Sequence, residues 1–147
     1  MSLDDWLQNG WLIAHRTSRE EISDLLALAG RDLLECQAEG LSPDWRLAIA
    51  YNSALQAATA ALAAAGYRAA RDGHHYRTIQ SLAYTIVADG DLIAKLDAFR
   101  KKRNISDYER SGCVSTQEAR EIFVLARSLK KAVEDWLKAN HPKLLKR

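Results

Sequence analysis

Eight of the twelve residues from Ala54 to Ala65 are alanine, in a stretch that Ser42-Pro43 precedes and Gly66 follows. Alanine is the best helix former, proline suits a first helical turn, and glycine commonly ends a helix. The sequence therefore predicts a helix from about residue 43 to residue 65. Because its side chains are so small, neighbouring helices can approach it closely on several sides.

Four further helices are expected from caps and apolar periodicity. A cap at Thr17-Ser18, with acids in the first turn, opens a helix that runs to about residue 39 before Gly40. Helical spacing of apolar residues predicts the others at about 74–87, 92–107 and 115–139. Strand-like alternation is nearly absent. Short links between helices favour antiparallel neighbours, so we expect an all-α, up-and-down bundle of four or five helices.

The chain has 147 residues, about the size of one domain. Residues 1–16 are expected to form an N-terminal extension, in which a short helix around residues 5–13 packs Trp6 and Trp11 onto the bundle. Residues 140–147 are expected to form a basic tail. Neither a repeat nor a second domain is apparent.

Composition narrows the class of protein further. The formal charge is +2, from 21 basic and 19 acidic residues, which does not by itself indicate nucleic-acid binding. No apolar run approaches the ~18 residues of a membrane span, and no export signal opens the chain. Cys36 and Cys113 fit no metal or redox spacing, and His74-His75 lacks the spacing of metal ligands. We therefore expect a cytoplasmic protein without metal or cofactor.

The helix expected at residues 92–107 carries charge on its apolar stripe. Arg103 falls among Leu92, Leu96 and Phe99 on a helical wheel, with Asp107 beside it. Removing water from an unpaired charge costs several kcal/mol. Arg103 and Asp107 are therefore expected either to brace each other and neighbouring helices, or to line a polar site.

Three local patterns resemble the HEPN family, helical bundles related to the C-terminal domain of kanamycin nucleotidyltransferase. They are a tyrosine-and-alanine helix that ends in Gly-Tyr (Ala50 to Ala54, then Ala64 to Arg68), His75 at the start of the third helix, and the arginine-rich run Arg100 to Tyr108. The resemblance spans about residues 18–137.

Many members of that family are metal-independent ribonucleases or toxins that pair with a small nucleotidyltransferase. In their motif, an arginine and a histidine a few residues later meet at a homodimer interface. Here Arg103 occupies the arginine position, with Asn104 beside it, but Tyr108 stands where the histidine would be. A tyrosine of pKa ~10 is a poor general base. The resemblance therefore implies the fold and a homodimer, and any catalysis would depend on Arg103, Tyr108 and His75.

Three functions remain open from the sequence. The first is a module that binds a nucleotide or an RNA phosphate, or regulates through it, by means of Arg100, Arg103, Asn104, Asp107 and Tyr108; basic residues interleaved with Tyr67 and Tyr76 suit such a ligand. The second is a metal-independent ribonuclease toxin. The third is a structural partner of a nucleotidyltransferase, with no ligand of its own.

Overall fold

The computed structural model describes residues 1–108 and 112–145, apart from the side chains of residues 106–108. The main helices are α1 (Leu3–Gln8), α2 (Arg19–Glu35), α3 (Pro43–Ala64), α4 (His74–Gln80), α5 (Gly90–Tyr108) and α6 (Thr116–Asn140). Short 3-10 turns, η1 (Ser81–Ala83) and η2 (Pro142–Leu144), follow α4 and α6, and two three-residue strands are β1 (Leu12–Ala14) and β2 (Tyr67–Ala69). The expected all-α class is confirmed.

The predicted helix starts are confirmed by the caps. The hydroxyls of Ser18, Ser42 and Ser115 each accept a hydrogen bond from the backbone N–H three residues on. The end of α2 differs from the prediction, because the helix stops at Glu35 rather than near residue 39. Beyond Glu35, the Arg46 guanidinium donates hydrogen bonds to the backbone carbonyl oxygens of Cys36, Ala38 and Leu41. These carbonyl groups therefore have hydrogen-bond partners although the helix has ended.

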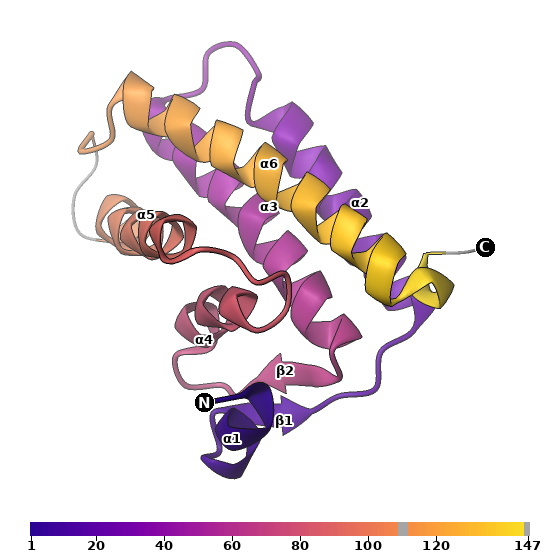
Figure 1. The fold of residues 1–147 in the computed structure, drawn as a ribbon. Coiled ribbons are helices and arrows are strands. Elements are labelled where there is room, and N and C mark those ends of the chain that lie inside the picture. The colour runs from indigo at the N-terminus through magenta and orange to yellow at the C-terminus, as the bar shows by residue number, and fades with distance from the viewer. Residues whose placement is uncertain (109–111, 146–147) are drawn as a thin grey trace.

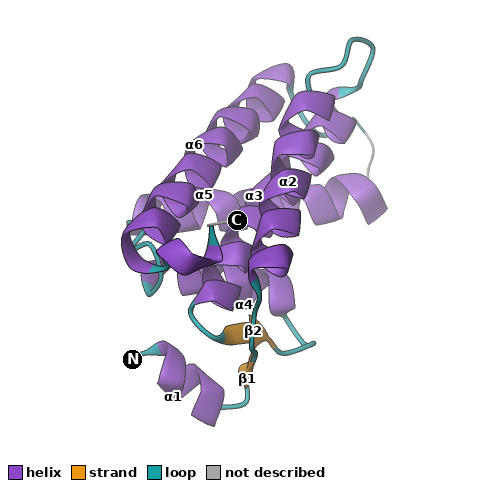
Figure 2. Cartoon of the chain, turned by 90° about the vertical axis from the view of Figure 1, so that its right-hand side faces the viewer, coloured by secondary structure: helices purple, strands orange, loops and turns teal. Residues whose placement is uncertain are grey.

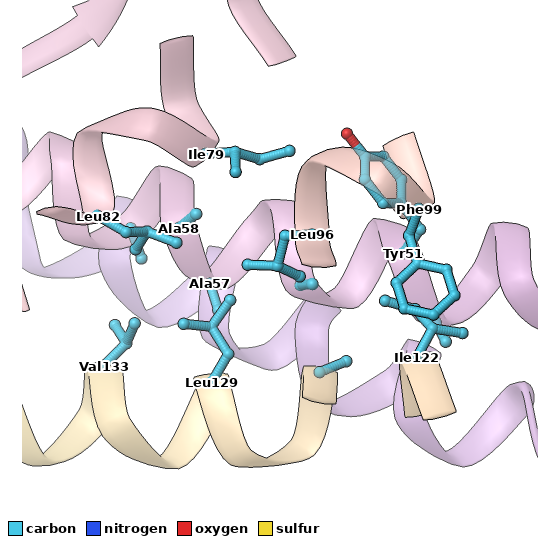
Figure 3. Packing of buried hydrophobic residues seen from close by; sticks show 14 of the residues in the cluster. Tyr51, Ala57, Ala58, Ile79, Leu82, Leu96, Phe99, Ile122, Leu129 and Val133 are labelled. Atoms are coloured by element: carbon cyan, nitrogen blue, oxygen red, sulfur yellow. The ribbon is translucent and has the colours of Figure 1, made fainter. Parts of the chain in front are cut away.

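Helix α3 is the centre of the fold. It packs against both α2 and α6; Figure 1 shows that it runs antiparallel to α2 and parallel to α6. Alanines of α3 meet larger side chains of α6, such as Leu129 and Val133 (Figure 3), and both Ala57 and Leu129 are almost completely buried. The predicted close approach on several sides is confirmed, since α2, α4, α5 and α6 all pack against α3.

The arrangement of α4 and α5 departs from the expected up-and-down bundle. Both helices lie across α2, α3 and α6 instead of alongside them (Figures 1 and 2). Because α3 and α6 are parallel neighbours, the chain between them has to return to the end where α3 began, and α4 and α5 make that return. Short links alone do not reveal this crossing.

The third predicted helix is also shorter than expected. Helix α4 ends at Gln80 and passes into the turn η1, and Val87 adopts a left-handed φ of 55°. The hydroxyls of Ser81 and Thr85 donate to the backbone carbonyls of Thr78 and Ser81. Such side-chain hydrogen bonds to nearby backbone carbonyls compete with the backbone hydrogen bonds that would continue the helix.

The N-terminal segment contains a strand that the sequence did not predict. The helix expected at residues 5–13 is α1, which ends at Gln8, and β1 then pairs antiparallel with β2 (Figure 2). Three-residue strands are too short to show alternation. Trp6 and Leu12 are buried against Leu62 of α3, and the guanidinium carbon of Arg77 lies 3.8 Å from the ring centroid of Trp11. The expected packing of Trp6 and Trp11 onto the helices is thus confirmed.

The chain after α6 is attached to the core. Leu144 and Leu145 are partly buried against it, so the expected basic tail is packed up to residue 145. One helix among the described residues, α3, is long and apolar enough to cross a membrane, contrary to the expectation from the sequence, but 67% of the qualifying window is buried inside the protein. Burial to that extent is typical of the core helix of a water-soluble fold.

Candidate functional site

Arg103 lies where the apolar stripe of α5 meets α3. Leu96 and Phe99 are buried, as predicted, and Arg103 is half-buried one turn further on. Its Nε atom is enclosed, and its guanidinium carbon lies 5.3 Å from the ring centroid of Tyr51 on α3. This distance is within the range of a cation–π contact. The prediction that α5 sets a guanidinium against the helical interior is confirmed.

His75 reaches the same tyrosine from α4. The ring centroids of His75 and Tyr51 are 6.1 Å apart, and those of His75 and His74 are 4.3 Å apart. Gly73 begins α4 with a left-handed φ of 63°, which turns the chain so that His75 faces α3 in the first helical turn. The structure therefore brings His75 and Arg103 together through a shared neighbour.

Arg100 extends the site along α5. Its Nε donates to Asp97 Oδ1 at 2.7 Å, and its guanidinium carbon lies 5.5 Å from the ring centroid of Tyr76. We call Tyr51, His75, Tyr76, Arg100 and Arg103 the Tyr51 cluster.

The remaining predicted residues divide into two groups. Asn104 is exposed on α5, next to Arg103. Asp107 and Tyr108 lie in the last turn of α5, and their side chains fall outside the described part of the structure. The Arg103–Asp107 brace and the role of Tyr108 therefore stay predictions.

The cluster is electrostatically positive. Burial, His74 and the guanidinium groups of Arg103 and Arg100 together lower the pKa of His75 to about 4. The imidazole is therefore neutral at physiological pH. Burial raises the pKa of Tyr51 to about 12, although Arg103 and Arg100 oppose that shift, so Tyr51 keeps its proton.

Tyr51 is the site residue that sequence reasoning missed. Tyr51 stands within the pattern Ala50 to Ala54, and a single tyrosine within an alanine-rich helix is itself a signal. Its side chain rises from α3 away from α6, toward the side of α4 and α5 (Figure 3). The hydroxyl is buried and has no hydrogen-bond partner among the described residues. A buried hydroxyl without a partner has lost its hydrogen bonds to water, and no hydrogen bond within the protein compensates for that loss.

We expect Tyr51→Phe to raise the free energy of unfolding by about 1 kcal/mol, because the substitution removes a buried polar group that lacks a partner. Urea denaturation measures the change. Tyr84→Phe is the matched control, since Tyr84 is 40% exposed. A destabilised Tyr51→Phe protein would show that the hydroxyl is satisfied in solution.

The cluster is suited to binding an oxyanion. Arg103 and Arg100 supply guanidinium donors, and neutral His75 supplies either a donor or an acceptor. Within the described residues, no group of three or more His, Cys, Asp or Glu side chains could hold a metal ion.

Comparison with known proteins does not assign the chain to a family. No protein-family model matches it, and a search of curated proteins also gave no match. The functional interpretation therefore depends on the geometry of the Tyr51 cluster.

Proposed function

We propose that this protein is a helical module that binds the phosphate group of a nucleotide or of RNA through the Tyr51 cluster. One observation carries the proposal: two guanidinium groups on successive turns of α5 each lie against a tyrosine ring, Arg103 at Tyr51 and Arg100 at Tyr76. Tyr76 is 37% exposed, so a base can stack on its ring beside Arg100, whereas the buried Tyr51 ring holds Arg103 in position.

Two further features support this proposal. The cluster draws residues from three helices that the sequence separates widely, so its geometry is fixed by the packing of the core. The pKa of His75 is low because of burial and also because His74, Arg103 and Arg100 place positive charge near it. A bound anion would reduce the repulsion among these positive groups.

The resemblance to the HEPN family, the homodimer and the nucleotidyltransferase partner belong to the same proposal, as does a cytoplasmic location. The homodimer can be tested by light scattering after size-exclusion chromatography. Purification of the protein from its native cells tests whether a nucleotidyltransferase accompanies it.

The binding proposal is tested by titrating the protein with a short single-stranded RNA and with AMP, at 50 and 200 mM salt. We expect Arg103→Gln to weaken RNA binding about 10-fold and to lower the slope of log affinity against log salt by about 1. Arg16→Gln is the control, because Arg16 is equally cationic but lies exposed before α2. Equal affinities for the Arg103→Gln, Arg16→Gln and unmodified proteins would contradict the proposal.

A metal-independent ribonuclease is the second candidate, and the position of His75 favours it. The imidazole lies beside Tyr51 in the same cluster as Arg103, and it is neutral at physiological pH. A base with a pKa of about 4 is nevertheless a weak proton acceptor.

An RNA-cleavage assay in the presence of EDTA separates the candidate functions. If RNA is cut, and both His75→Ala and Arg103→Gln abolish cutting, the protein is a nuclease and not only a binding module. If the RNA stays intact but binds, the module reading holds. If neither occurs and a nucleotidyltransferase co-purifies, the protein is a structural partner.

A further inference from the structure

A groove lies at the end of the molecule where both α3 and α6 begin. Its volume is about 730 Å³, within the 300–1,000 Å³ range of sites for small organic ligands. Residues of the loop between α2 and α3 and the start of α3 form one wall, and residues of the first turns of α6 form the other. None of its lining residues belongs to the Tyr51 cluster.

The surface of this groove is amphipathic. Apolar side chains make up most of it, including Leu41, Pro43, Ala119 and Phe123. Two arginines, Arg46 and Arg120, also line it, and none of the described residues that line it is acidic. A ligand that fits this surface carries an apolar body and a negative charge.

Arg46 is held in place before any ligand arrives. Its Nε, Nη1 and Nη2 atoms donate to the carbonyl oxygens of Leu41, Cys36 and Ala38 at 3.3, 3.0 and 2.8 Å. A guanidinium has five N–H donors, so two remain beyond these three bonds. A fixed cation loses little conformational entropy when it binds an anion. Arg120 is exposed on the opposite wall, on α6.

Two acidic residues at this end of the molecule are already engaged. Asp44 Oδ2 accepts from the backbone N–H of Gly112, and Glu118 caps α6 and pairs with Lys102 Nζ at 3.5 Å. The N-terminal ends of α3 and α6, where Pro43 and Thr116 are the first helical residues, add the positive end of each helix dipole. Among the described residues that line the groove, the only charged side chains are Arg46 and Arg120, which favours an anion there; Glu39 and Glu121 lie nearby and are exposed.

We infer that this groove binds a small organic carboxylate with an aliphatic chain, whose carboxylate lies between Arg46 and Arg120 and whose chain lies along Phe123 and Leu41. We expect the charge alone not to suffice, because Arg46 is partly exposed and Arg120 is exposed, and an ion pair in water contributes little to binding. The inference is independent of the Tyr51 cluster and of its proposed ligand.

The probe is decanoate, titrated into the isotope-labelled full chain and followed by NMR. We expect saturable shifts confined to the α2–α3 loop and to the first turns of α6. Decanol tests the chain without the charge, and acetate tests the charge without the chain; both should bind more weakly than decanoate. Failure of decanoate to saturate by 1 mM, or shifts centred on α4 and α5, would overturn the inference.

Two variants separate the contributions. Arg120→Gln should weaken decanoate binding about 5-fold or more, and decanol binding less than 2-fold, because only decanoate loses a charged contact. Phe123→Ala should weaken both ligands by about 5-fold, through lost apolar contact. Arg120 is exposed, so its replacement should leave the fold intact, which the unperturbed part of the spectrum verifies. If Arg120→Gln leaves decanoate affinity unchanged, the carboxylate does not lie between the arginines.

Discussion

Replacing Ala57 by leucine should destabilise the protein by about 3 kcal/mol, the upper end of the usual cost of overpacking a core. Ala57 is fully buried on the face of α3 that meets α6, opposite Leu129 (Figure 3). A leucine there has no free space, so the two parallel helices must separate. Since domains of this size are commonly stable by 5–15 kcal/mol, the loss is a large share of the total. Urea denaturation followed by circular dichroism measures it.

The control for this prediction is the same substitution on a surface. Ala27 is exposed on α2, and Ala27→Leu should change the free energy of unfolding by less than about 0.5 kcal/mol. Equal stabilities for the two variants would show that α3 and α6 are not closely packed in solution.

Acidification from pH 6.5 to pH 4 should cost the protein stability through His75. The pKa of this imidazole is about 4 in the folded protein, against an ordinary value of 6.5. Between those values the unfolded chain binds a proton that the folded protein does not, so the free energy of unfolding falls as the pH falls. One full proton corresponds to about 1.4 kcal/mol per pH unit. Since His75 is partly exposed to solvent, which screens its interactions, we expect a total loss of roughly 2 kcal/mol.

The effect is isolated by comparing the protein with His75→Gln at a series of pH values. Carboxylates such as Glu21 and Glu118, whose pKa values are lowered in the fold, contribute equally to both proteins and cancel in the comparison. The variant should lose less stability than the parent between pH 6.5 and pH 4. Parallel curves for His75→Gln and the parent would show that His75 titrates normally.

Local signals in the sequence predicted the helices well, because caps and small residues act over a few positions. Ser18, Ser42 and Ser115 begin α2, α3 and α6 as expected. The crossing of α4 and α5 was not predictable from such signals, since it depends on α3 and α6 being parallel neighbours. The pairing of β1 with β2 was missed for a related reason: each strand has three residues, and its partner lies more than fifty residues away.

The candidate site was predicted in part. Periodicity placed Arg103 against the interior, and the resemblance to the HEPN family placed His75 near it; both residues lie beside Tyr51. Tyr51 itself could not be assigned a role, because its importance comes from contacts with two helices that follow it in the chain. The groove between Arg46 and Arg120 was not foreseen either. Its walls come from the turn after α2 and from the start of α6, which only the folded chain brings together.

The pairing of β1 with β2 has a consequence for the protein during its synthesis. Residues 12–14 leave the ribosome before α2 and α3, but their hydrogen-bonding partners are residues 67–69. Until that later segment has emerged, Trp6 and Leu12 have no apolar surface to cover them, because Leu62 is also still to come. The N-terminal segment can therefore pack only after α3 has been synthesised. Until then its two tryptophans, Trp6 and Trp11, are exposed to chaperones that bind nascent chains.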